Sequence, residues 1–139
     1  MSLQELEERK WEIHKQIESL HLQREDCDSL QKNIDYLEEE SGWQNKIIKE
    51  TNDNLYDSYP NDRHLRNLLV EKEELLMQKI SDENRFFEEC RELIREQRKI
   101  IDAKREDFEE ELLSIQKREE EEHDENHIHT NTSWQRHIP

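Results

Sequence analysis

Large apolar residues occur in adjacent pairs along the C-terminal half of this sequence. In the stretch FFEECRELIREQRKII, residues 86–101, three such pairs recur every seven residues, and most of the residues between them are charged. A two-stranded coiled coil needs apolar residues that alternate three and four apart, so one apolar residue of each pair is surplus to that pattern. The chain is therefore expected to form long helices that carry more apolar surface than one helix–helix seam uses.

Composition favours long helices over a compact globular fold. Of the 139 residues, 42% are charged and 30% hydrophobic, with one Gly and two Pro. So few turn residues argue against a β-fold, and the regular spacing of the apolar residues argues against disorder. The net charge of -16 disfavours nucleic acid and anionic membrane surfaces as partners. No apolar run reaches the ~20 residues of a membrane span, and the N-terminus does not resemble a signal peptide, so we expect no membrane insertion and a cytoplasmic location.

Two heptad-patterned segments, separated by a segment rich in turn-forming residues, predict a helical hairpin. The first helix is expected over about residues 3–50 and the second over about residues 62–121, with a turn at about 51–61 where Asn, Asp, Ser and the internal Pro gather. Ser2 is a candidate N-cap for the first helix, and Asn61 or Asp62 for the second. We therefore predict an all-α fold. Residues 1–121 form an elongated antiparallel two-helix hairpin resembling a coiled coil, and residues 122–139 form a disordered acidic tail that contains histidines.

A register follows if the chain folds back about residue 58 or 59. Apolar residues then meet across much of the seam, in the pairs Leu37–Ile80, Leu30–Phe87, Cys27–Cys90 and Ile17–Ile100. Reduced thiols are favoured for the two cysteines in the cytoplasm, and a disulfide is the alternative. The step of eleven residues from Leu75 to Phe86 interrupts the heptads and is expected to unwind the supercoil locally.

No motif for catalysis or cofactor binding is present. The sequence lacks a Gly-rich phosphate loop, a nucleophile elbow and an HExxH motif, and carboxylates on an exposed helix have no dry pocket for acid–base chemistry. His123, His127 and His129 could bind zinc or nickel, but a flexible tail would have to order itself around the ion. We expect no enzymatic activity, no cofactor and no bound metal.

The surplus apolar residues are the candidate binding site. Adjacent residues on a helix point ~100° apart, so if Phe87, Ile94 and Ile101 face the first helix, the preceding residue of each pair does not. The first helix carries a second apolar stripe roughly opposite its heptad column, and its Trp and Tyr residues are of the kind favoured at interfaces. The expected partner-binding residues are Phe86, Leu93 and Ile100 on the second helix, and Trp11, Leu22, Tyr36 and Trp43 on the first.

Two segments carry a resemblance to a known family: the opening LEERKWEIHKQIESL, with Trp11 early in a Glu-rich helix, and the closing KEELLMQKISDENRFFEECRELIREQRKIIDAKREDFEEELL. Over about residues 3–118 the chain resembles the LXG-associated α-helical accessory proteins of the bacterial type VIIb secretion system. This resemblance implies a chaperone-like hairpin that binds the N-terminal helical domain of an LXG toxin. With a second small helical accessory protein, the hairpin would help deliver the toxin to the secretion apparatus.

The sequence departs from the related WXG-type secreted proteins. It has Gly42-Trp43 in place of Trp-x-Gly, and its Tyr-xxx-Glu match at Tyr36 lies in the middle of a predicted helix. We therefore transfer no export signal to this chain and expect a cytoplasmic adaptor. The alternative is a structural coiled coil that self-associates, with the surplus stripes covered by a second copy.

Overall fold

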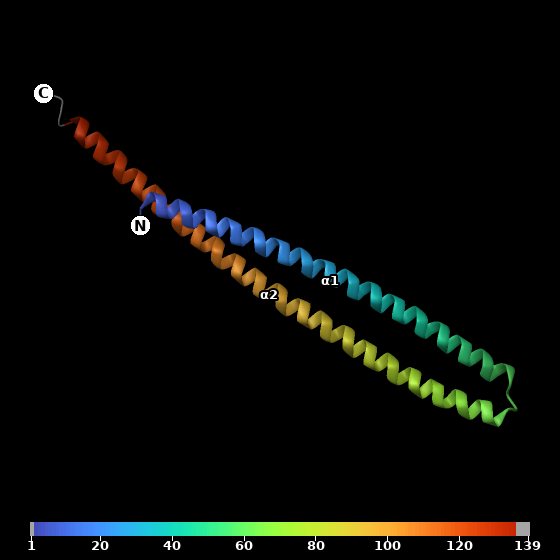
Figure 1. Cartoon of the computed structure of the whole chain (residues 1–139). Coiled ribbons are helices and arrows are strands. Elements are labelled where there is room, and N and C mark those ends of the chain that lie inside the picture. The colour runs from blue at the N-terminus through green and yellow to red at the C-terminus, as the bar shows by residue number, and fades with distance from the viewer. Residues whose placement is uncertain (1, 136–139) are drawn as a thin grey trace. The chain divides into compact units, whose positions relative to one another are not determined.

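Two helices make up the part of the chain that the structure describes. The computed structural model describes the backbone of residues 2–135 and the side chains of residues 2–123. Helix α1 spans Leu3–Ser58 and helix α2 spans Arg63–Gln135 (Figure 1). No strand occurs within residues 2–135, and the prediction of an all-α chain with two paired helices is confirmed.

The contacts divide the chain into two compact units, and both helices contribute to each. The terminal unit comprises the residues up to Glu25 and from Arg98 onward, and the turn unit comprises Asp26–Gln97. In the terminal unit, Leu6, Ile13 and Ile115 form a buried cluster. The helices are antiparallel within each unit, because higher numbers on α1 pair with lower numbers on α2. The pairs that show this are Arg9–Glu111 and Arg24–Asp102 in the terminal unit, and Asp35–Arg91 and Asn45–Glu83 in the turn unit.

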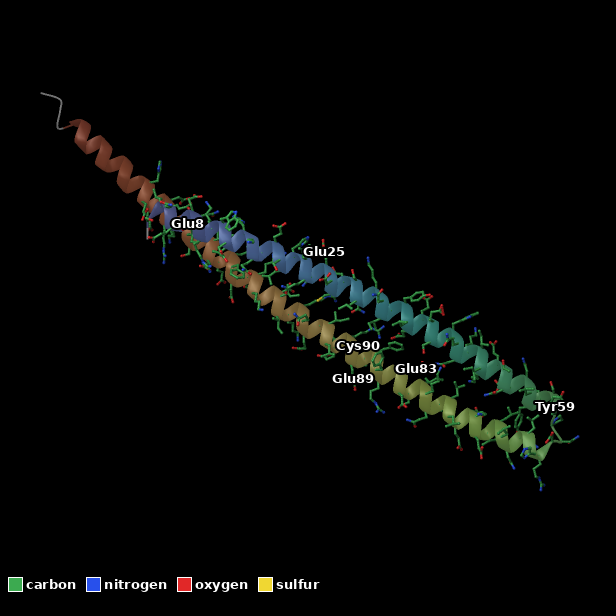
Figure 2. The ribbon with its side chains drawn as sticks, viewed as in Figure 1. Glu8, Glu25, Tyr59, Glu83, Glu89 and Cys90 are labelled. Carbon is green, nitrogen blue, oxygen red and sulfur yellow. The ribbon has the colours of Figure 1, made fainter. Side chains whose placement is uncertain are left out.

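The turn is shorter than predicted, because α1 continues as helix through residues 51–58. It ends at Ser58, and the next residue, Tyr59, precedes Pro60; a residue before proline is sterically disfavoured in the α conformation. Figure 2 labels Tyr59 at this turn. The carboxylate of Asp62 accepts a hydrogen bond from the backbone N–H of Leu65 at 2.9 Å, which confirms Asp62 as the N-cap of α2.

The far end of α2 also differs from the predicted boundary. Its backbone remains helical to Gln135, past the expected end near Glu121 and into the segment, residues 122–139, for which we expect disorder. The side chains from Asp124 onward and residues 136–139 lie outside the described part of the chain. Disorder of that segment stays a prediction.

The predicted register is wrong by about nine residues. Folding about residue 58 or 59 places Asp35 level with Asp82, whereas the carboxylate of Asp35 pairs with Arg91 at 3.0 Å. Heptad columns match one another in more than one register, and the turn lies later in the chain than the predicted centre. The residue pairs predicted across the seam, Leu37–Ile80, Leu30–Phe87, Cys27–Cys90 and Ile17–Ile100, are therefore not level with each other.

Both cysteines are free thiols, as favoured from the sequence. Because the helices are antiparallel and Arg91 pairs with Asp35, Cys90 lies level with Tyr36, nine residues along α1 from Cys27. At ~1.5 Å per residue this offset is about 14 Å along the helix axis, too far for a disulfide.

The seam of the turn unit changes phase in both helices. On α2 the buried residues are Leu69, Leu76, Phe87 and Ile94, with steps of seven, eleven and seven. On α1 the buried or half-buried residues Cys27, Ile34, Asn45 and Asn52 have the same steps. A step of eleven shifts a left-handed coiled coil toward a straighter packing, as predicted for α2.

A polar junction of Asn45, Lys79 and Glu83 lies where the two steps of eleven face each other. Asn45 is buried; its Nδ2 donates to Glu83 Oε2 at 3.2 Å, and its Oδ1 accepts from Lys79 Nζ at 2.7 Å. Lys79 also pairs with Glu83 at 2.9 Å. The junction satisfies the polar groups of these three residues at the seam and places the two phase breaks level with each other.

Candidate partner-binding surface

The apolar pairs of α2 are divided between seam and solvent as the sequence predicts. In the turn unit, Phe87 and Ile94 are 6% and 7% exposed, whereas their neighbours Phe86 and Leu93 are 56% and 71% exposed. The pairs nearer the turn follow the same rule: Leu69 and Leu76 are buried, and Leu68 and Leu75 are exposed. In the terminal unit Ile101 is buried and Ile100 exposed. Every described pair therefore keeps one large apolar side chain out of the seam.

The stripe predicted on α1 is exposed as well. In the terminal unit Trp11 and Leu22 are exposed, and the ammonium of Lys15 lies 5.1 Å from the centre of the Trp11 ring. In the turn unit Tyr36 and Trp43 are exposed. The structure thus assigns the seven predicted residues to two units, with Phe86, Leu93, Tyr36 and Trp43 in the turn unit and Trp11, Leu22 and Ile100 in the terminal unit.

Tyr36 and Trp43 border a shallow depression of about 440 Å³ on the surface of α1. The Tyr36 hydroxyl donates to Glu40 at 3.2 Å, and the negative charge of Glu40 raises the pKa of the phenol. The ammonium of Lys46 lies 5.8 Å from the centre of the Trp43 ring. These local contacts hold two aromatic side chains at the surface without covering them, an arrangement suited to contact with another protein.

On one side of the seam in the turn unit, ion pairs at Arg91 join the two helices. Arg91 on α2 donates to Asp35 at 3.0 Å and also to Glu38, both on α1. The hydrogen bond from Arg91 is the main reason that the pKa of Asp35 lies below its usual value. This side of the seam is therefore bridged by charge.

Sequence reasoning missed four exposed apolar residues on α1. The wrong register placed Leu30 and Leu37 in the seam, but both are exposed, and so are Ile48 and Leu55. Their steps of seven, eleven and seven repeat those of Leu68, Leu75, Phe86 and Leu93 on α2. That shared spacing was the signal in the sequence from which they could have been found.

The described residues offer little for other kinds of site. Among residues 2–123 no group of three His, Cys, Asp or Glu side chains is placed to hold a metal ion, and the side chains of His127 and His129 lie outside this range. Neither helix, over its described length, contains a stretch apolar enough to cross a lipid bilayer.

Comparison with known proteins identifies no relative. No protein-family model matches the sequence, and neither a curated protein nor a solved structure is significantly similar to the chain.

Proposed function

We propose that this chain is a non-enzymatic adaptor that binds α-helices of another protein. The observation that carries the proposal is the exposure of one large apolar residue in each pair on α2, with Phe86 and Leu93 as the clearest cases. Large apolar residues aligned on one face of a helix are the surface that helix-in-groove recognition uses. The adaptor would cover the apolar helices of its partner until that partner is delivered.

The resemblance to LXG-associated helical proteins supports a narrower form of the proposal. In this form the partner is the N-terminal helical domain of an LXG toxin of a bacterial type VIIb secretion system, bound in the cytoplasm. A second small helical accessory protein completes the complex. The support lies in the sequence segments around Trp11 and from Lys72 to Leu113.

Co-purification tests the adaptor with a matched pair of variants. The chain is co-expressed with the N-terminal helical domain of an LXG toxin. Leu93→Asp is expected to reduce recovery of the partner at least tenfold. Met77→Asp is the control, because Met77 is exposed to a similar degree but lies outside the column of Phe86 and Leu93. Equal recovery with the two variants would contradict the proposed surface.

Self-association is the rival function, since a second copy could cover the same exposed residues. Light scattering on the purified chain separates the two functions. The adaptor is expected to be a monomer or a loose aggregate that becomes a defined complex with its partner. A stable homodimer that ignores the LXG domain would support the scaffold instead.

A further inference from the structure

Two matched apolar columns run along the turn unit, one on each helix. The α1 column consists of Leu30, Leu37, Ile48 and Leu55, and the α2 column of Leu68, Leu75, Phe86 and Leu93. All eight residues are exposed and all lie within Asp26–Gln97. Steps of seven, eleven and seven average close to 3.6 residues per turn, so each column stays on one face of its helix.

The ion pairs of Arg91 show that these columns lie on the same side of the seam. Relative to the seam residue Ile34, Glu38 is four positions later and Leu37 three positions later, which places them on opposite sides of the seam. Arg91 is four positions after the seam residue Phe87, and it likewise lies on the other side of the seam from Phe86. Because Arg91 bonds to Glu38, these two residues share one side, and Leu37 and Phe86 share the other.

The two columns therefore flank a groove whose floor is the seam. Cys90, half-buried and three positions after Phe87, lies on the groove side; in Figure 2 it is seen on the side of α2 that faces α1, whereas Glu89 is on the side away from α1. Midway along, the polar junction interrupts the groove. Asn45 falls in the step of eleven on α1, and Lys79 and Glu83 fall in the step of eleven on α2.

The rims of this groove carry negative charge, and the residues that flank the two columns on their outer sides include no basic residue. The residue three positions after each column residue lies on the outer rim. On α2 these residues are Glu71, Gln78, Glu89 and Glu96, and on α1 they are Asn33, Glu40, Thr51 and Ser58. Two lysines, Lys72 and Lys79, lie near the groove. Lys79 pairs with Glu83 in the polar junction.

We propose that the groove holds a single basic amphipathic helix of another protein. Lys or Arg residues flank its apolar stripe, the apolar residues follow steps of seven, eleven and seven, and a polar residue faces the junction. At 25 residues from the first column position to the last, the helix is about 38 Å long. A second copy of this chain is the poorer occupant, because it would bring its own acidic rims against these. The inference rests on the proposed adaptor function and specifies the chemistry of the partner.

Three synthetic helical peptides test the inference with the full chain, by fluorescence anisotropy. The first has leucines at the proposed steps and lysine flanks. The second keeps the leucines but has glutamate flanks, and the third has the composition of the first with leucines at uniform steps of seven. The first peptide is expected to bind at least tenfold more tightly than the second, with affinity that falls as salt rises, and several-fold more tightly than the third.

Variants of the chain locate the binding. Leu37→Asp, on the column that only this inference uses, is expected to weaken binding of the first peptide at least tenfold. Met77→Asp is expected to leave it unchanged, and circular dichroism verifies that both variants keep their helix content. Equal binding of the lysine and glutamate peptides, or no effect of Leu37→Asp, would overturn the inference. A homodimer that the first peptide cannot enter would overturn it in favour of a second copy.

The outcome separates this inference from the function on which it rests. If no peptide binds but the LXG domain is still recovered in a manner that depends on Leu93, the adaptor stands and the proposed partner chemistry is wrong. If the LXG domain is not recovered either, the adaptor fails with it.

Discussion

The neighbours Leu93 and Ile94 provide the sharpest test of how the apolar pairs are divided. Ile94→Ala removes three carbons from a side chain that is 7% exposed. At about 0.8 kcal/mol per buried CH₂ this costs about 2.4 kcal/mol, and the higher helix propensity of Ala returns a few tenths. The seam is one layer of side chains beside an open groove, so the added cavity cost is small, and the expected loss is about 2 kcal/mol.

The matched change Leu93→Ala is expected to alter stability by less than about 0.5 kcal/mol, because that side chain is 71% exposed. Urea unfolding followed by circular dichroism at 222 nm measures both variants under the same conditions. The two changes remove the same number of carbon atoms one residue apart on one helix, so only their position relative to the seam differs. Equal losses, or a larger loss for Leu93→Ala, would refute the division of the pairs between seam and solvent.

Three further predictions concern the backbone, charge and register of the turn unit. Gly42→Ala is expected to raise stability by about 0.5–1 kcal/mol, because Gly42 lies within α1 and no atom within 4 Å would meet an added Cβ; a lower urea midpoint would contradict this. Arg91→Gln is expected to lower the urea midpoint at pH 7, and the difference from the unchanged chain should shrink as pH falls below about 4. The reason is that the carboxylate of Asp35, whose pKa lies below its ordinary value of 3.8, stabilises the fold above that pH and loses this contribution as it is protonated. A difference in urea midpoint that persists at pH 2 would indicate a packing effect instead. Mild oxidation with diamide is expected to form no intramolecular disulfide between Cys27 and Cys90, and mass spectrometry of the intact chain measures this. Formation of that disulfide would support the register that the structure contradicts.

The sequence predicts burial within each helix better than it predicts contact between helices. The spacing of Phe87 and Ile94 against Phe86 and Leu93 was enough to separate seam from surface, because a regular helix converts residue number into direction. The N-cap at Asp62 followed from local chemistry in the same way. These features depend on interactions within a few residues.

The register could not be predicted because it depends on where the chain turns and on the step of eleven residues that both helices share. Asn, Asp and Ser in residues 51–58 are typical of a loop, but the helix continues through them to Ser58, two residues before Pro60. A shift of the turn moves every pair across the seam. A register that places Leu30 and Leu37 in the seam leaves the α1 side of the candidate groove unrecognised.

The paired phase breaks limit how the length of such a chain can change. In the terminal unit the columns repeat every seven residues, so removing one heptad from α1 together with one from α2 leaves the remaining seam in phase. In the turn unit a deletion of seven residues in one helix alone would move its step of eleven away from the other, so that Asn45 would lie level with Leu76 or Cys90 in place of Glu83. Natural length variants are accordingly expected to gain or lose heptads in pairs, one from each helix, while the distance from Asn45 to Glu83 through the turn stays constant.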